Sequence, residues 1–217
     1  MKQVALVVAL MMFLWLPLAH SDSHDADVEK CFEFRRATGD PDLAIDHCTR
    51  VITAGRLPNA KLARIYYKRG NAWAKKRDLD RSTADYNDAI RLKPRYTDAF
   101  FNRGQNWYEK HDYDRGIADH NEVVRINLHD GEAIYFRGWG YYSKGQYDQA
   151  IADYSEAIRL KPDFDWIYIN RGLAWEKQGD LGRAIADFET AIRLNPQETF
   201  AVEHRERARL LKGKFAK

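Results

Sequence analysis

The segment Gly131–Pro162 reads GEAIYFRGWGYYSKGQYDQAIADYSEAIRLKP, and it nearly matches the chain when it is shifted by 34 residues in either direction. Glycine recurs at this spacing, at Gly70, Gly104, Gly138 and Gly172. A ring-bearing residue recurs in the same way, at Tyr86, His120, Tyr154 and Phe188. Self-similarity at such a period is typical of repeat arrays, in which each unit buries its apolar face against its neighbours. The period therefore decides the architecture before any single helix is assigned.

Four regular units follow from this period: residues 61–94, 95–128, 129–162 and 163–196. Each unit shows helical periodicity twice, with a break near its middle. In the last two units the break contains Gly145 or Gly179, and glycine suits the left-handed residue that ends a helix. An aspartate that can cap the next helix occupies one shared position, at Asp78, Asp112 and Asp180. Each unit is thus predicted to be a helix–turn–helix.

The segments on either side of the regular units depart from the pattern. Residues 28–60 form a degenerate first repeat, in which Cys48 takes the position of Tyr154. Terminal repeats are expected to differ, because they have a neighbour on one side only. Residues 197–217 contain one more amphipathic helix and a tail, which we expect to cap the last apolar surface. Residues 22–27 are polar and are expected to be flexible.

The regular units resemble tetratricopeptide repeats, which are helix–turn–helix units of about 34 residues. In the third unit the positions of the family pattern are held by Ile134, Gly138, Tyr141, Ala150, Tyr154, Ala157 and Pro162. The second unit (95–128) departs most, and its second helix is expected to be degenerate. Its replaced positions are Gly116, His120, Val123 and Leu128. The resemblance implies an all-α fold, a right-handed α-solenoid of helix–turn–helix repeats with a C-terminal capping helix.

The first 21 residues have the layout of a secretory signal. Lys2 supplies a short basic start, Val4–Leu18 is an apolar run, and Ala19–Ser21 places small residues at a cleavage site. The run is shorter than the roughly 20 apolar residues that span a bilayer comfortably. Residues 1–21 are therefore predicted to be a signal peptide, and the chain is predicted to be secreted or periplasmic. The alternative is an uncleaved segment that anchors the chain to the membrane.

Export places the chain in an oxidising compartment, where disulfides persist. Cys31 and Cys48 are the only two cysteines, and an even pair is what one disulfide needs. Both lie on predicted helices of one pair, so we expect them to form a disulfide. The alternative is two buried free thiols.

Two charged positions are identical in all four regular units. Arginine occurs at Arg69, Arg103, Arg137 and Arg171, and aspartate occurs at Asp85, Asp119, Asp153 and Asp187. Because the two recur together, we expect each arginine to pair with an aspartate of a packed helix, as guanidinium and carboxylate geometries match. The alternative is a ladder of arginines that binds an anionic ligand.

A further set of positions, on the first helix of each unit, varies between the copies and often stays apolar. Spacings of three, four and seven residues place them on one stripe of each helix. The residues of this stripe that we single out are Tyr67, Asn71, Phe101, Gln105, Tyr108, Tyr135, Trp139, Tyr142 and Trp166. In tetratricopeptide repeats the matching stripe lines a concave groove that binds peptides or helices, so the resemblance implies an aromatic partner-binding groove. The alternative is that these rings contact the neighbouring unit or the C-terminal helix.

Composition and motifs argue against several other classes of function. The net charge is +3, from 35 basic and 32 acidic residues that are interspersed, so no strong field is available to hold nucleic acid. No metal-binding spacing, phosphate-binding glycine loop or catalytic signature appears, and no cofactor is predicted. The sequence predicts a protein, not an enzyme, that binds a protein or peptide partner as a scaffold or adaptor. The alternative is a permanent structural subunit of an envelope complex, or a homo-oligomer, that uses the same surface.

Overall fold

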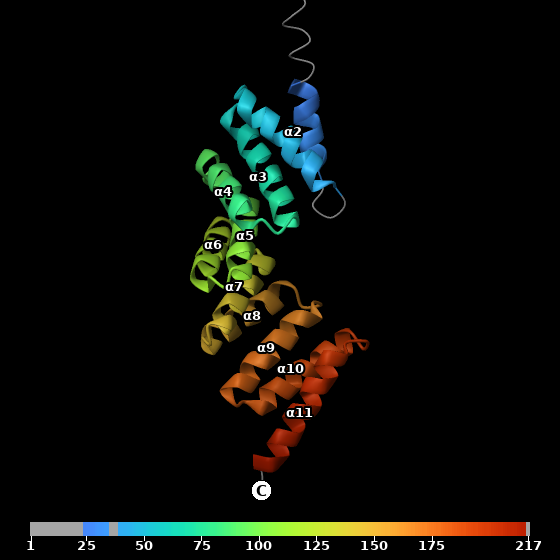
Figure 1. Cartoon of the computed structure of the whole chain (residues 1–217). Helices are drawn as coiled ribbons and strands as arrows, with labels where there is room; N and C mark the ends of the chain where they lie inside the picture. Colours follow the sequence, from blue (N-terminus) through green and yellow to red (C-terminus); the bar gives the residue numbers. More distant parts are fainter. Residues whose placement is uncertain (1–23, 35–38, 216–217) are drawn as a thin grey trace, which may run out of the picture. The chain divides into compact units, whose positions relative to one another are not determined.

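The computed structural model describes residues 24–34 and 39–215, and every regular element in these two ranges is an α-helix (Figure 1). The predicted signal peptide, residues 1–21, lies outside them. A helix over residues 24–33 comes first. The others are α2 Pro41–Ala54, α3 Asn59–Lys75, α4 Leu79–Leu92, α5 Thr97–Glu109, α6 Tyr113–Ile126, α7 Gly131–Ser143, α8 Tyr147–Leu160, α9 Asp165–Gln178, α10 Leu181–Leu194 and α11 Thr199–Phe215. The predicted all-α array of helical repeats is confirmed.

The chain divides into two compact units at Asn102 and Arg103, so α5 runs across the division. The N-terminal unit contains α2, α3 and α4, and the C-terminal unit contains α6 to α11. Within the two described ranges, none of the helices combines the length and the apolar character that crossing a membrane requires.

Each regular helix pair is held by the repeated arginine and aspartate. In every pair the arginine donates two hydrogen bonds to the carboxylate, through Nε and a terminal nitrogen. The shorter N–O distances are 2.7 Å for Arg69–Asp85, 2.6 Å for Arg103–Asp119, 2.6 Å for Arg137–Asp153 and 2.7 Å for Arg171–Asp187. The predicted pairing is confirmed, and these arginines join helices to one another instead of forming a ladder for an anionic ligand.

The turns between paired helices follow the predicted chemistry, with one variation. Asp78, Asp112 and Asp180 each accept a hydrogen bond from the backbone N–H three residues later, which caps α4, α6 and α10. Gly145 and Gly179 adopt the expected left-handed backbone, with φ of 75° and 84°. In the two preceding pairs the residue just before the capping aspartate is not glycine but Arg77 or His111, with φ of 64° and 60°.

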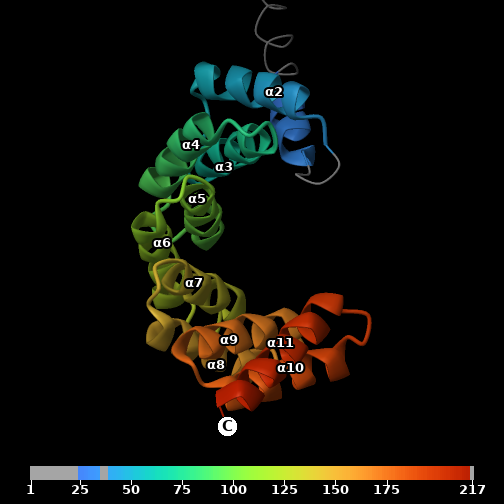
Figure 2. The same ribbon diagram turned by 60° about the horizontal axis from the view of Figure 1, so that its bottom comes forward.

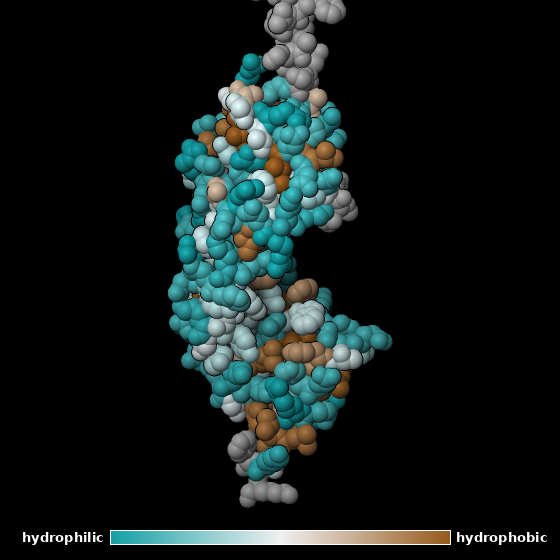
Figure 3. Space-filling view, in the orientation of Figure 1, coloured by the Kyte–Doolittle hydropathy of each residue, from teal (hydrophilic) through white to brown (hydrophobic). Residues whose placement is uncertain are grey.

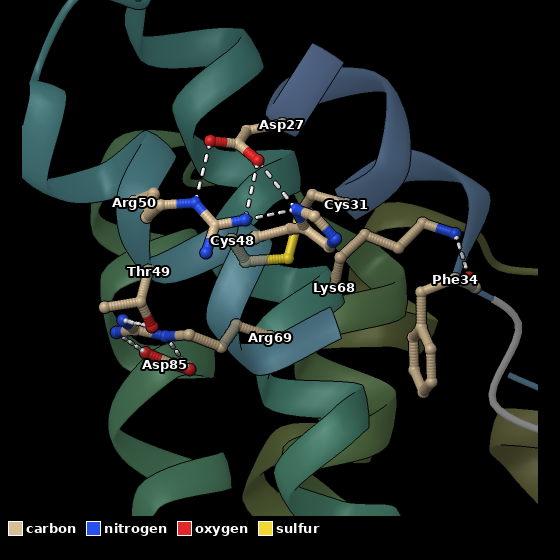
Figure 4. Close-up of a disulfide and its surroundings, with 10 residues drawn as sticks. Asp27, Cys31, Phe34, Cys48, Thr49, Arg50, Lys68, Arg69 and Asp85 are labelled. Atoms are coloured by element: carbon tan, nitrogen blue, oxygen red, sulfur yellow. Dashed lines mark hydrogen bonds and ion pairs between the residues drawn. A yellow bond between two sulfur atoms is a disulfide. The ribbon is translucent and has the colours of Figure 1, made fainter. Parts of the chain in front are cut away.

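A disulfide ties the helix over residues 24–33 to α2 (Figure 4). It joins Cys31 to Cys48, whose Cα atoms are 5.1 Å apart, and both side chains are fully buried beside Val51 and Ile65. The degenerate first repeat therefore has an apolar core of its own, at the interface between its two helices and α3.

Residues 24–27 are helical, which corrects the expectation that the segment 22–27 is flexible; residues 22 and 23 lie outside the described ranges. The reason is an ion-pair cluster that anchors this turn to α2 (Figure 4). Asp27 accepts hydrogen bonds from Arg50 at 2.7 and 2.8 Å and lies 2.6 Å from Nδ1 of His47. The bonds from Arg50 hold the pKa of Asp27 well below its usual range.

The C-terminal unit ends with α11, which packs against α10 (Figure 2). Ala201 and Ala208 of α11 are fully buried in one apolar cluster with Phe188 and Ala191 of α10. Small residues at this spacing let the two helices approach closely. α11 thus covers the apolar face that the last repeat would otherwise expose, as expected of a capping helix.

Candidate partner-binding surface

The predicted groove residues do not share one environment. Trp166 is exposed, with 43% of its surface accessible, whereas Asn71 and Tyr108 are buried. The others are half-buried: Tyr67, Phe101, Gln105, Tyr135, Trp139 and Tyr142.

In the N-terminal unit, Asn71 belongs to a buried hydrogen-bond network. Its side-chain oxygen accepts a bond of 2.7 Å from the Tyr86 hydroxyl and one of 2.9 Å from the amide of Asn102. The same Asn102 amide donates to the hydroxyl of Tyr67 at 3.1 Å. The ring of Tyr67 also packs on Tyr96, with centroids 5.1 Å apart. Asn71 therefore does not face a partner, which corrects its assignment to the groove.

In the C-terminal unit, Tyr108 is a core residue. A Cβ on Gly116 would lie 2.2 Å from Cε1 of Tyr108, and a Cβ on Gly140 would lie 2.4 Å from its hydroxyl oxygen. The ring thus fills space that these two glycines leave, and its hydroxyl donates to the Phe136 carbonyl at 3.0 Å. Burial raises the pKa of Tyr108. The feature of the sequence that could have indicated a buried Tyr108 is Gly116, which replaces the alanine of the family pattern.

Trp139 and Tyr142 lie on α7 and are backed by other rings. Trp139 packs edge-on against Tyr108 at 5.0 Å and against Tyr113 at 5.9 Å between centroids. Tyr142 packs on Tyr147 at 5.6 Å, and burial raises its pKa. Both rings are held by neighbours on α5, α6 and α8, so each presents only part of its surface to solvent.

α11 contacts two later positions of the same stripe on α9, Ile169 and Glu176. Glu176 lies 2.6 Å from the guanidinium of Arg207 and 3.5 Å from Nδ1 of His204. Ile169, three residues after Trp166 on the same helix, is buried in the cluster that includes Ala201 and Ala208. The alternative prediction, that stripe residues contact the C-terminal helix, therefore holds for Ile169 and Glu176 of α9.

An exposed aromatic patch remains where α9 begins, formed by Phe164, Trp166 and Phe200. Their exposed fractions are 49%, 43% and 37%, which makes them the exposed large rings of the described residues. The centroids of Trp166 and Phe200 are 6.4 Å apart. Hydrophobic side chains also gather over α9 and α10 in the space-filling view (Figure 3). Phe164 and Phe200 were not among the predicted site residues, because they lie outside the repeated stripe.

A cavity of about 190 Å³ opens next to this patch, between the starts of α7 and α9. We call it the α7–α9 pocket. Its lining residues are Gly131, Glu132, Tyr135, Phe136, Lys161, Phe164 and Ile167. Tyr135 is the one predicted groove residue in its wall; burial raises the pKa of its hydroxyl, against the effect of the bond from Asn170 at 2.9 Å. The feature of the sequence that could have indicated this pocket is Phe164, an aromatic residue in the turn just before Trp166.

Among the described residues, no cluster of three or more histidine, cysteine, aspartate or glutamate side chains has the geometry to hold a metal ion. The surface described above offers apolar rings with a few charges at their edge. Such a surface supports binding by apolar contact.

Three family models match parts of the chain. Two are described as tetratricopeptide repeat or TPR repeat and match residues 166–198 and 140–179, and a third, also described as tetratricopeptide repeat, matches residues 63–96. No curated protein matches the sequence at a significant level.

Several solved structures share the fold. MamA from Desulfovibrio magneticus RS-1 is 19% identical, with a TM-score of 0.72 over 82% of this chain and 97% of that one. A tetratricopeptide repeat protein from Parabacteroides merdae ATCC 43184 is 18% identical, with a TM-score of 0.77 over 90% and 75%. YrrB, described as a TPR protein with an unusual peptide-binding site, is 18% identical, with a TM-score of 0.68 over 76% and 84%. At these identities the similarity establishes the fold alone.

Proposed function

Because the chain is a tetratricopeptide repeat protein, we propose that it acts as a protein–protein interaction scaffold without catalysis of its own. We further propose that the aromatic patch, together with the rings of α7, binds a peptide or a helix of a partner protein. The description of YrrB as a TPR protein with a peptide-binding site supports this reading by analogy of fold.

The exposure of the aromatic patch is the observation that carries the proposal. Exposed apolar surface is informative when large rings gather, because aromatic anchors supply much of the binding energy at protein interfaces. Trp166 and its two neighbours in the patch keep between 37% and 49% of their surface accessible. Burial of such rings by a partner removes apolar area from water at about 25 cal/mol per Å².

The frame beneath the patch is rigid before any partner arrives. Ile167 and Ile169, which follow Trp166 on α9, are almost fully buried and fix the helix. The backbone that carries Trp166 is therefore already ordered, which lowers the cost of association. The mechanism is recognition by preformed aromatic anchors.

The test compares Trp166→Ala with Leu210→Ala, which removes an even more exposed apolar side chain, from α11. Each purified protein, without residues 1–21, is used to capture partners from the exported fraction of the source cells, with quantification by mass spectrometry. A partner lost with Trp166→Ala and kept with Leu210→Ala supports the proposal, provided that the circular dichroism of the variant is unchanged. Equal recovery with both variants would refute it.

The same patch is available to a second copy of the chain or to a permanent complex. Light scattering of the purified protein separates the two modes. A monomer across the accessible concentration range favours transient partner binding, whereas a stable oligomer that Trp166→Ala dissociates assigns the patch to a permanent interface.

We also propose that residues 1–21 direct export and are removed, so that the chain acts in the periplasm or outside the cell. The pairing of Cys31 with Cys48 supports this, since disulfides persist in oxidising compartments. Fractionation followed by N-terminal sequencing tests it: the exported chain is expected to begin at Asp22, and recovery of an intact Met1 in the membrane fraction would favour an uncleaved anchor.

A further inference from the structure

We propose that the α7–α9 pocket takes one aromatic side chain of the partner polypeptide, and that this residue is flanked by lysine or arginine. The inference rests on the proposed function, because it names the short sequence that the scaffold recognises. Size, wall chemistry and the charges at the rim each contribute to it.

The size of the pocket selects a ring. An apolar cavity of about 150 Å³ is large enough to bind benzene. The α7–α9 pocket measures about 190 Å³, so a phenyl or phenol group fits with little space to spare. A small side chain such as alanine leaves most of this volume unfilled, and the walls then lose their dispersion contacts.

The walls of the pocket are aromatic and apolar. Ile167, 1% exposed, supplies a buried aliphatic surface. Tyr135 packs edge-on against Phe136 at 5.0 Å and against Phe164 at 6.4 Å between centroids. Its hydroxyl is already engaged by Asn170. A further ring adds to this edge-to-face arrangement, which is worth about 0.5–1.5 kcal/mol per pair beyond area burial.

The charged residues at the opening of the pocket and next to it in sequence carry an excess of negative charge. Glu132 and Lys161 line the opening, and Asp163 lies in the same turn as Lys161 and Phe164. All three residues are exposed. Glu132 and Lys161 thus balance each other in the lining, and Asp163, next to the lining residue Phe164, adds one negative charge beside the opening.

Two further carboxylates, Asp130 and Asp165, adjoin residues that line the pocket. Asp130 caps α7 by accepting from the N–H of Ala133 at 3.0 Å, so the positive end of that helix is already offset. Asp165 lies in the first turn of α9 and accepts a hydrogen bond from the side-chain amide of Asn195 at 2.9 Å. The chain as a whole has a net charge of +3, yet this rim is acidic. A cationic residue beside the inserted ring is the complementary partner, because like charges across an interface are strongly disfavoured.

The experiment uses three blocked pentapeptides: Ser-Lys-Phe-Lys-Ser, the same peptide with alanine in place of phenylalanine, and Ser-Glu-Phe-Glu-Ser. Binding to the whole chain without residues 1–21 is followed by NMR titration and calorimetry at low salt. We expect the lysine–phenylalanine peptide to bind at least about tenfold more tightly than either control, because burial of a phenyl ring and charge complementarity each contribute about that factor. The preference for lysine over glutamate is expected to shrink at high salt.

Two protein variants locate the site. Glu132→Lys reverses the exposed carboxylate at the rim and is expected to invert the preference between the lysine and glutamate peptides. Phe164→Ala removes a half-exposed wall and is expected to weaken every phenylalanine peptide by about tenfold or more. Leu210→Ala is the matched control and is expected to leave all affinities unchanged.

The outcomes separate this inference from the proposed function. Equal binding of the three peptides, or an unchanged preference in Glu132→Lys, overturns the pocket assignment even when Trp166→Ala still abolishes partner capture. If the wild type self-associates and Glu132→Lys abolishes this, the pocket binds a second copy of this chain. That result would overturn the assignment to a separate partner. Retained capture by Trp166→Ala defeats the proposed function, whatever the peptides do.

Discussion

Arg137 of α7 binds Asp153 of α8 at two points: Nε lies 2.7 Å from Oδ2, and a terminal nitrogen lies 2.6 Å from Oδ1. The same pairing joins the first and second helix of each of the other three regular repeats. A paired guanidinium and carboxylate fix the rotation of one helix against the other, because the planar fork accepts only one orientation. The pair thus sets geometry at every repeat.

Asp153→Asn is expected to lower the free energy of unfolding by about 2–3 kcal/mol, because Arg137 keeps its charge but loses the opposing one. This lies below the range for a fully buried pair, since 21% of the Arg137 side chain is exposed. Urea unfolding measures the change. The control is Glu156→Gln, which removes the exposed pair with Arg159 and is expected to have no measurable effect. Equal midpoints for Asp153→Asn and wild type would rule out a structural role for the pair.

His120 is expected to make the chain less stable in mild acid. Burial lowers its pKa to about 4, from an ordinary value of 6.5, although its Nδ1–H donates to the Gly116 carbonyl at 2.9 Å. The unfolded chain therefore binds the proton first, so this contribution is complete above pH 6.5 and is lost as the pH falls from 6.5 toward 4. The loss amounts to roughly 3 kcal/mol.

Urea unfolding of wild type and His120→Phe at pH 7, 5.5 and 4.5 isolates this effect, because carboxylates titrate equally in both proteins. Phenylalanine occupies the same repeat position at Phe188, so the substitution suits the site. The stability difference between the two proteins is expected to move in favour of the variant as the pH falls. Parallel pH profiles would contradict a buried neutral histidine.

Gly138→Ala is expected to destabilise the chain by about 1–3 kcal/mol, because the added Cβ meets the Tyr154 ring at 3.0 Å and Cβ of Asp153 at 3.1 Å. Gly182→Ala is the matched substitution. Its nearest neighbour would be 3.5 Å away, and alanine favours the exposed helix by up to about 1 kcal/mol. Thermal unfolding is expected to shift downward for the first variant and slightly upward for the second, and equal shifts would show that helix approach at Gly138 is not tight.

The Cys31–Cys48 disulfide is expected to stabilise the N-terminal unit by about 3 kcal/mol, the loop-closure value for a separation of 17 residues. The double variant Cys31→Ala, Cys48→Ala removes the link and keeps the site apolar. Reductant is expected to lower the melting temperature of the wild type and to leave that of the double variant unchanged. Two alkylatable thiols in the unreduced protein exported by cells would show that the link does not form.

The sequence predicted the core of the repeats more closely than the binding surface. Gly138, Asp153 and Asp180 recur or follow local rules, so their roles in helix approach, pairing and capping were predictable from the chain alone. Tyr108 was misassigned because its stripe position suggested a surface, while Gly116 and Gly140 make room for its ring in the core. Periodicity assigns a face of a helix, but it does not say whether another element covers that face.

The 34-residue period by itself determined the helical repeats, the turns and the arginine–aspartate pairs, since each depends on residues that the copies share. Only the tertiary structure decided which rings stay exposed. α11 buries Ile169 of α9 but leaves 43% of the Trp166 surface accessible. Phe164 lies beside Tyr135 although 29 residues separate them in the chain. Exposure depends on neighbours that are distant in sequence, and a repeated pattern contains no information on how the last unit is capped.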